Sequence, residues 1–307
     1  MASPHGAGLK RLAALSISVL YFGGARLRKG VRRWLRLQTP GTCVVLYYHG
    51  VAREHRARFA RQMDLLLREA QPVAAGRKEP LAPGVHHAAV TFDDGYQNVI
   101  ENALPELKSR RIPATVFVIS EALGRFPFWL TDPRDPAHQD RVLSPDELTG
   151  MASELVAVGS HTMTHRALPE LSRDEARREL SGSRAKLETM LHRPVTLFSF
   201  PYGAMNGELT GMCRESGYDR VFTILPGLAL SDPEEFVTPR VAVEPTDSAF
   251  EFRLKVMGAY GWLPLAYALK RKVRSTLLGR GRGREKRQSG AGWQAASAPE
   301  QVHHVSD

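Results

Sequence analysis

Cysteine is scarce in this chain of 307 residues, where only Cys43 and Cys213 occur. Two thiols cannot build a disulfide-rich scaffold or an all-cysteine metal site, and nothing in the sequence favours a bridge between them. Long apolar runs are also missing, because the run at 12–24 has only 13 residues and is too short to span a bilayer unaided. Apolar residues make up 43% and charged residues 24%, which excludes a collagen-like or globally disordered chain.

Acidic residues are absent from positions 1–40, which carry eight lysines and arginines. Residues 270–288 carry nine lysines and arginines against Glu285 alone. Each flank thus has a net charge of +8. The two flanks together exceed the net charge of the whole chain, which is +10, so the body between them has a negative net charge. A nucleic-acid-binding domain would carry positive charge on its folded body. The distribution therefore argues against nucleic acid as a partner and indicates a globular core with two cationic flanks.

Residues 9–37 interleave apolar residues with arginines and contain Trp34, a pattern typical of a segment that lies in a membrane interface. A signal peptide is the alternative, because Lys10 and Arg11 precede the apolar run, but no clear small-x-small cleavage site follows. Aromatic residues at 260–267 likewise precede the second basic run. We expect peripheral association with an anionic membrane surface, on a side that the sequence leaves open. A secreted protein and merely solvated basic tails are the alternatives.

Between the flanks, short β-rich segments alternate with longer amphipathic ones. The predicted strands lie at 43–51, 88–95, 114–120, 155–160, 196–203, 218–225 and 237–243. The predicted helices lie at 56–70, 98–110, 144–153, 172–192, 206–216 and 247–258. This alternation predicts the α/β class, with a parallel sheet that forms a (β/α)7-type barrel or an open doubly wound sheet. We expect a basic amphipathic segment at 1–41, one catalytic domain at 42–258 and a basic, largely disordered tail at 259–307.

Polar residues gather directly after four of the predicted strands. These groups are His49-Gly50, Asp93-Asp94-Gly95, the segment from His161 to His165, and Pro201-Tyr202-Gly203. The carboxyl ends of parallel strands meet at one rim of the sheet, where α/β proteins carry their functional groups. We therefore expect these four groups to lie close together.

The residue types at this rim suit a catalytic metal site. Adjacent aspartates such as Asp93 and Asp94 raise each other's pKa in a cleft unless a cation is bound. One carboxylate with His161 and His165 gives three protein ligands and leaves a fourth position for water, as in catalytic zinc sites. The other aspartate is then available as a general base. Each motif alone is more often a simple turn or an incidental histidine pair, but their shared position favours a metal-dependent hydrolase.

Three motifs together resemble the NodB-like polysaccharide deacetylases, the fourth family of carbohydrate esterases. They are Thr91-Phe92-Asp93-Asp94-Gly95, Ser160-His161-Thr162-Met163-Thr164-His165 and Phe200-Pro201-Tyr202-Gly203. The resemblance covers roughly 42–250 and implies a distorted barrel of about seven β/α units. It also implies that Asp93 is the catalytic base and that the metal ligands are Asp94, His161 and His165. The Tyr202 backbone N–H would help to bind the oxyanion, with Pro201 beside it at the substrate.

Two departures from the family pattern concern the groups around the base. The third motif usually begins with an arginine that orients the base, and Ser199 stands in its place here. Arg240, at the end of a late β-rich segment, is the candidate to supply the guanidinium instead. The family's late Leu-x-His motif is also missing, but Leu46-Tyr47-Tyr48-His49 is similar to the arrangement in a circularly permuted bacterial subgroup, which includes deacetylases of exported poly-N-acetylglucosamine. His49 would then be the general acid, and a buried structural histidine is the alternative.

The sequence thus predicts a metal-dependent N-deacetylase that acts on an N-acetylated sugar in a polysaccharide, oligosaccharide or glycolipid. Zinc is the metal favoured by the ligand types, with cobalt, nickel and iron as alternatives. The rival hypotheses are an amidase or O-acetyl esterase of the same fold acting on a non-sugar substrate, and a metal-free carbohydrate- or membrane-binding module. The long loop at 121–142 carries Trp129, which could stack on a sugar ring or pack against the core.

Overall fold

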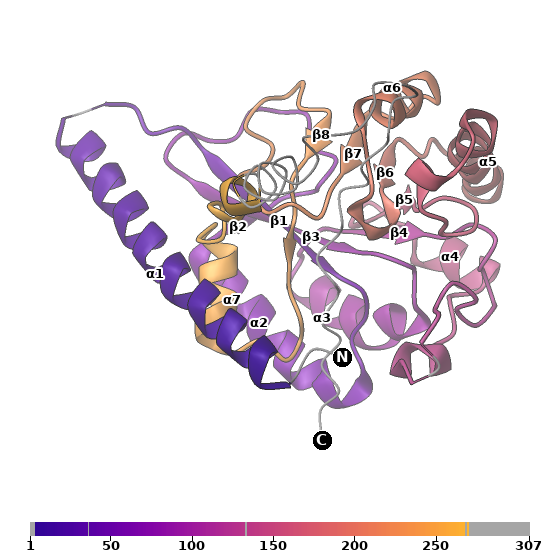
Figure 1. The fold of residues 1–307 in the computed structure, drawn as a ribbon, viewed down its shortest axis with the longest axis horizontal. Coiled ribbons are helices and arrows are strands. Elements are labelled where there is room, and N and C mark those ends of the chain that lie inside the picture. Colours follow the sequence, from indigo (N-terminus) through magenta and orange to yellow (C-terminus); the bar gives the residue numbers. More distant parts are fainter. Residues whose placement is uncertain (1–3, 36, 133, 268, 270–307) are drawn as a thin grey trace, which may run out of the picture.

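The computed structural model describes residues 4–35, 37–132, 134–267 and 269, and its centre is a curled, fully parallel sheet of nine strands (Figure 1). The strands are β1 (Thr42–Tyr48), β2 (Gln71–Pro72), β3 (His86–Phe92), β4 (Ala114–Val118), β5 (Val156–Ser160), β6 (Leu197–Ser199), β7 (Arg220–Phe222), β8 (Val237–Thr238) and β9 (Val241–Ala242). Their order is β8-β7-β6-β5-β4-β3-β1-β9, with β2 paired to β3. The predicted α/β class and distorted barrel are confirmed.

The two edges of the curled sheet are joined by the chain itself. β8 pairs with β7 at one edge and β9 pairs with β1 at the other, yet only Pro239 and Arg240 separate β8 from β9. The sequence predicts one strand at 237–243, and the structure divides it into two strands at this point. Proline has no amide hydrogen to offer to a ladder, which favours a break in the strand. The break leaves Arg240 at the seam of the barrel.

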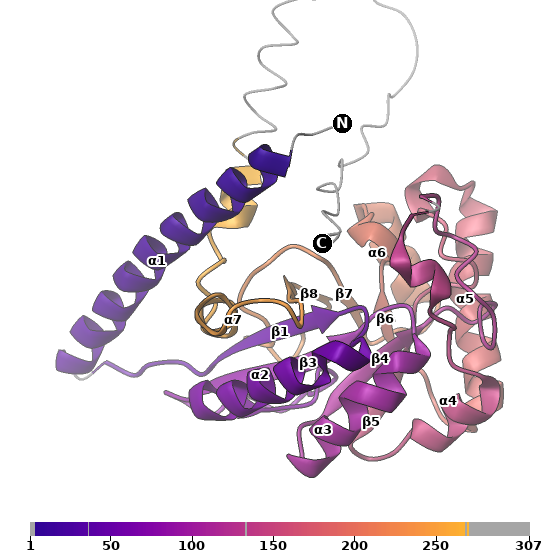
Figure 2. The ribbon, with the colours of Figure 1, turned by 90° about the horizontal axis from the view of Figure 1, so that it is seen from below.

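Six helices follow the strands and cover the sheet, at the positions that the apolar periodicity predicts (Figures 1 and 2). They are α2 (Arg56–Glu69), α3 (Leu104–Ser109), α4 (Pro145–Met151), α5 (Arg173–Leu191), α6 (Gly207–Glu215) and α7 (Ala249–Val256). A π-helical turn, η2 (Val99–Ala103), leads into α3. Complete capping boxes at Ser144 and Ser172 start α4 and α5, because each serine and a glutamate three residues later satisfy each other's backbone N–H.

Alternate residues of each strand face opposite sides of the sheet. In β1, Val44, Leu46 and Tyr48 pack into a large cluster with the residues of α2 and α3. Cys43 and Val45 face the other way, into a second cluster inside the barrel with Phe117, Leu197 and Phe222. The barrel is therefore filled, and functional groups have space only at its rim. Both cysteines are buried free thiols.

The N-terminal segment forms one long helix, α1 (Pro4–Trp34), which lies outside the barrel against α7 (Figures 1 and 2). Leu15 and Phe22 of α1 pack with Leu254 and Tyr260, and the Trp262 indole N–H donates to the buried hydroxyl of Ser18 at 2.9 Å. Among the residues that the structure describes, no helix is long and apolar enough to cross a bilayer. Of the tail at 259–307 that the sequence predicts to be largely disordered, residues 268 and 270–307 fall outside the described residues.

Candidate active site

The carboxyl ends of β3, β5 and β6 bring the predicted motifs together at one rim. Asp93 and Asp94 follow β3, His161 follows β5, and Tyr202 lies in the turn η5 (Pro201–Gly203) after β6. The parallel register explains this placement, because β3 to β6 are neighbours that end at the same edge of the sheet. The backbone therefore gathers the site from segments that are far apart in the sequence.

Asp94, His161 and His165 form a compact group of buried side chains. Oδ1 of Asp94 lies 3.5 Å from Nε2 of His161 and 3.3 Å from Nε2 of His165. One ligand atom from each residue lies within 4.8 Å of the other two, a spacing at which the three could hold a single metal ion. The structure thus brings together the three residues that the sequence predicts as metal ligands.

Hydrogen bonds orient both imidazole rings toward Asp94. Nδ1 of His161 donates to the carbonyl oxygen of Ser199 at 2.8 Å, which leaves the Nε2 lone pair facing the site. Nδ1 of His165 lies 3.1 Å from the hydroxyl of Tyr202. Burial lowers the pKa of His161 to about 4 and that of His165 well below its ordinary value. Both rings are therefore neutral at neutral pH, as metal ligands must be.

The pKa of Asp94 is raised and not lowered, and this shift favours a cation bound by Asp94, His161 and His165. Burial and the neighbouring Asp93 carboxylate raise the pKa of Asp94 to about 8, and a hydrogen bond from Tyr96 opposes them only in part. Its Oδ1 is buried without a hydrogen-bond partner among the described residues. A buried carboxylate oxygen between two imidazole nitrogens is satisfied by a divalent metal of the zinc type. The donor set and the unpaired oxygen therefore fit a metal ion.

Arg240 binds the other aspartate through both of its terminal nitrogens. Nη1 donates to Asp93 Oδ1 and Nη2 to Asp93 Oδ2, each at 2.7 Å. The remaining N–H groups donate to the Thr91 hydroxyl, the Ser199 hydroxyl and the Thr223 carbonyl oxygen. All five guanidinium donors are thus used, although the side chain is fully buried. The contact between Arg240 and Asp93 that the sequence suggested is present.

This arrangement keeps Asp93 ionised in a buried position. Burial by itself would raise the pKa of Asp93, but the charge and hydrogen bonds of Arg240, with help from His161 and His49, lower it to about 2. The guanidinium also lies 4.6 Å from the ring centroid of Tyr47, a cation–π contact inside the barrel. The hydroxyl of Ser199 accepts a hydrogen bond from Arg240 Nη2 and donates one to Asp93 Oδ2 at 3.4 Å. A small side chain at 199 therefore lets the arginine of the β8–β9 seam reach the base.

Backbone strain is concentrated at the same rim. Asp94, Thr162, His165 and Tyr202 have φ between 58° and 67°, and they are four of the seven non-glycine residues with positive φ in the described chain. Left-handed conformations of such residues cost energy and persist where the surrounding structure holds them. Gly203, also at positive φ, has no space for a β-carbon because Ile224 lies against it. The strained residues therefore coincide with the residues that the sequence predicts at the site.

Glu179 holds the loop between the two histidines, and the sequence analysis did not identify it. One of its carboxylate oxygens accepts hydrogen bonds from the backbone N–H of Met163 at 2.8 Å and of Thr164 at 2.9 Å. The other accepts the hydroxyl of Thr164 at 2.5 Å. Glu179 is buried on the inward face of α5, as is Ser183. A polar residue at a core position of an amphipathic helix was the signal that could have found it.

His49 and Trp129 also lie at the site. His49 directly follows β1 and is half-buried, and its positive charge would lower the pKa values of Asp93, His161 and His165. Trp129 packs against His165 with ring centroids 5.3 Å apart. It also contacts Tyr96 and the small apolar cluster beneath the loop at 121–142. Trp129 therefore packs on the core and also lies against a predicted metal ligand, and its stacking on a sugar ring stays a prediction.

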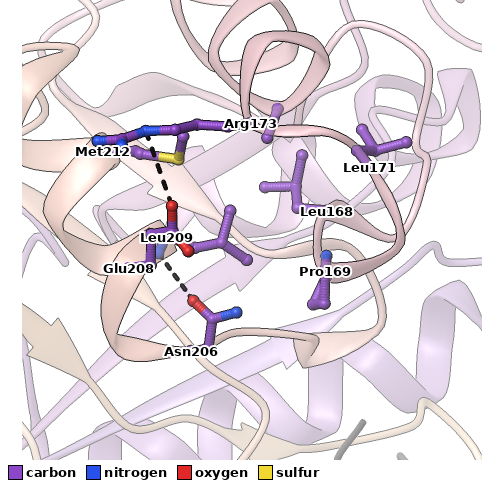
Figure 3. A pocket seen from close by; sticks show the side chains of 9 residues that line it. Leu168, Pro169, Leu171, Arg173, Asn206, Glu208, Leu209 and Met212 are labelled. Atoms are coloured by element: carbon purple, nitrogen blue, oxygen red, sulfur yellow. Dashed lines mark hydrogen bonds and ion pairs between the residues drawn. The ribbon is translucent and has the colours of Figure 1, made fainter. Parts of the chain in front are cut away.

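A separate pocket of about 320 Å³ lies between the turn η4 (Leu168–Glu170) and the N-terminal ends of α5 and α6 (Figure 3). Its polar groups satisfy one another, because Arg173 pairs with Glu208 at 3.7 Å and Asn206 caps α6 through the N–H of Leu209. None of the predicted site residues lines it. The pocket is therefore separate from the predicted site at the barrel rim.

Comparison with known proteins gives a consistent set of relatives. Residues 82–221 match the family model described as polysaccharide deacetylase. YxkH of Bacillus subtilis is 26% identical over 241 residues, which are 74% of this chain and 78% of YxkH. The poly-beta-1,6-N-acetyl-D-glucosamine N-deacetylase of Staphylococcus epidermidis is 27% identical over 175 residues, and the match spans 54% of this chain and 57% of that protein. The structure of IcaB from Ammonifex degensii has a TM-score of 0.58 and 26% identity, covering 71% of this chain and 98% of IcaB.

Proposed function

We propose that this chain, whose residues 82–221 match the polysaccharide deacetylase family, removes N-acetyl groups from an N-acetylated sugar in a polysaccharide, oligosaccharide or glycolipid. One observation carries the proposal. The buried Asp94–His161–His165 group lies beside an ionised Asp93 that Arg240 holds with both of its terminal nitrogens. Metal-dependent hydrolysis needs these two elements, a three-ligand site with an open position and an adjacent base.

Asp94, His161 and His165 would hold a divalent metal, zinc by ligand type with cobalt, nickel or iron as alternatives. Such an ion supplies Lewis-acid chemistry, because it polarises an amide carbonyl and acidifies water. The hydrogen bonds to Ser199 and Tyr202 keep both imidazoles facing it. The protein thus contributes a preformed and partly strained set of ligands.

Asp93 would act as the general base. Arg240 keeps its carboxylate ionised and fixes its plane, so the carboxylate is available to accept a proton from the attacking water. Arg240 does not need to touch the substrate and is a positioning residue in this scheme. It replaces the arginine that the family's third motif usually supplies, from the seam between β8 and β9.

His49 would act as the general acid. The hydroxyl of the attacking water adds to the acetamide carbon, the carbon–nitrogen bond then breaks, and the leaving amine takes a proton from His49. The products are acetate and a glucosamine-type sugar. The Tyr202 backbone N–H, in its strained turn, would donate to the developing oxyanion. His49 at the front of the domain supports the likeness to the circularly permuted subgroup.

The aromatic surroundings of His165 support a sugar substrate. Trp129 lies on it with centroids 5.3 Å apart and Tyr202 with centroids 4.6 Å apart. With Pro201 in the same turn, these rings would form the wall against which a sugar ring stacks. The relative from Staphylococcus epidermidis is named a poly-beta-1,6-N-acetyl-D-glucosamine N-deacetylase, which supports the same class of substrate. A non-sugar amide or an O-acetyl ester is the alternative substrate for the same groups.

We also propose that the enzyme works at a membrane surface, with secretion as the alternative. The two cationic flanks around an acidic body support this location. An N-acetylated polymer or glycolipid would then be met close to the bilayer.

The test is to measure metal content and acetate release from N-acetylglucosamine oligomers for the wild type, Asp93→Asn and Asp94→Asn. We expect about one metal ion per chain in the wild type and in Asp93→Asn, and much less in Asp94→Asn. Acetate release should require both aspartates. Bound metal without acetate release would indicate that the substrate is a non-sugar amide or ester. Absence of metal in all three proteins would leave only the hypothesis of a metal-free binding module.

A further inference from the structure

The side of α1 that faces away from α7 is apolar and uncovered. Leu20, Leu27 and Trp34 are 77%, 71% and 82% exposed, and Val31 between them is exposed as well. At 3.6 residues per turn these positions lie on one face, opposite to Ser18, which is buried against the body. In both views α1 lies on the outer side of α7 (Figures 1 and 2). The exposed side chains therefore form a stripe directed away from the barrel.

A second exposed apolar element is attached to α1. Trp262 donates to Ser18, and the Tyr21 hydroxyl lies against Gly261. Just beyond this contact, Leu265 is 75% exposed, and Tyr267 and Leu269 are exposed too. Leu265 and Tyr267 thus follow closely in the chain on the residue that holds α1. We call the exposed side chains of Leu20, Leu27, Val31 and Trp34 the outer apolar face.

In the sequence, the segment that carries this face contains no acidic residue. Positions 1–40 carry eight lysines and arginines and no acid, and nine more cations follow at 270–288. Arg26 is exposed, with its guanidinium 4.9 Å from the ring centroid of Phe22. A long amphipathic helix with an apolar stripe, cationic residues and an exposed tryptophan has the properties of helices that lie in the bilayer interface.

We propose that the outer apolar face docks on an anionic lipid bilayer, with α1 lying in the plane of the interface. The apolar side chains would enter the boundary between headgroups and acyl chains, and the cations would pair with lipid phosphates. A second copy of the chain is a poorer occupant, because it would bring two strongly cationic segments together. α1 has 31 residues, but it is not apolar enough to span the membrane. The docking does not depend on the deacetylase chemistry.

The full chain is tested by co-sedimentation with vesicles of phosphatidylcholine alone and of phosphatidylcholine with an equal part of phosphatidylglycerol. Wild type should bind the anionic vesicles and bind more weakly as salt is added. Leu20→Glu combined with Leu27→Glu should weaken binding by about tenfold or more, since each leucine loses its burial in lipid. Leu67→Glu is the matched control, because Leu67 is 42% exposed on α2, away from this face, and its replacement should leave binding unchanged.

The depth of insertion gives a second readout. Lipids brominated on their acyl chains should quench the fluorescence of Trp34, so Trp34→Phe should remove most of the quenching that the wild type shows. Deacetylation of soluble oligomers should be the same in the Leu20→Glu/Leu27→Glu protein, which separates failure of docking from failure of the proposed function. Equal vesicle binding by that variant would overturn the proposal and assign binding to the charges alone. Absence of binding to anionic vesicles, or a change of oligomeric state on substitution without lipid, would overturn it as well.

Discussion

Replacing Arg240 by methionine removes the guanidinium but keeps an unbranched side chain of similar length. Asp93 would then be buried without its counter-charge, and breaking a buried pair in this way costs about 3–5 kcal/mol of folding free energy. The pKa of Asp93 should rise, because burial raises it and the charge of Arg240 no longer opposes that effect. Protonated or misoriented Asp93 cannot accept a proton from water. We expect kcat/KM at neutral pH to fall on the order of a hundredfold or more, the range of general-base contributions.

The assay is acetate release as a function of pH, together with urea unfolding of the same proteins. Because the wild-type carboxylate stays ionised down to about pH 2, the acidic limb of its profile should not report Asp93. In Arg240→Met a new acidic limb should appear at higher pH. Arg240→Lys keeps the charge but loses the bidentate geometry, so it should retain most of the folding stability while losing activity. Added guanidinium should restore part of the activity of Arg240→Met. Wild-type activity and pH profile in a folded Arg240→Met protein would refute the positioning role.

Three further outcomes are expected. Zinc binding to the metal-free protein should release a proton from Asp94 at pH 7, because Asp94 has a pKa of about 8 and both histidines are already neutral; calorimetry in buffers of different ionisation enthalpy measures this, and no release at pH 7 would contradict it. Glu179→Gln should weaken zinc binding by about tenfold, since the loop between the histidines loses buried acceptors. Ser183→Ala on the same face of α5 is its control and should bind zinc normally, and equal affinity in both variants would reject the role of Glu179. His49→Gln should lower kcat by about a hundredfold with full metal content, whereas unchanged kcat would remove His49 from the mechanism.

The fold and the metal group were accessible from sequence because both depend on local pattern. Apolar runs of strand length alternating with amphipathic helices define a parallel sheet, and polar residues at strand ends then share a rim. This reasoning placed Asp94, His161 and His165 together, and the structure finds their ligand atoms within 4.8 Å. The two-residue strand β2 was missed, since a segment so short has no periodicity to detect.

Other features depend on contacts that no local pattern contains. Glu179 and the loop it holds come from different elements, and only tertiary packing brings the carboxylate to the backbone of Met163. The pattern of α1 predicts an interfacial segment, but its attachment to the body depends on Trp262 near the other end of the chain. Arg240 was a candidate because an arginine was needed, whereas its full set of five donor contacts follows from the seam between β8 and β9.

That seam also sets an order of assembly. The residues of the metal group and the base all precede position 166, but the arginine that neutralises the base emerges much later in synthesis. Until β9 adds to β1, Asp93 lacks the guanidinium that neutralises it, and its pairing with Arg240 stabilises the docking of the last strands. A chain with its final turn unfinished would therefore still possess its metal ligands but not an oriented base. The barrel therefore closes and the base becomes oriented in the same folding step.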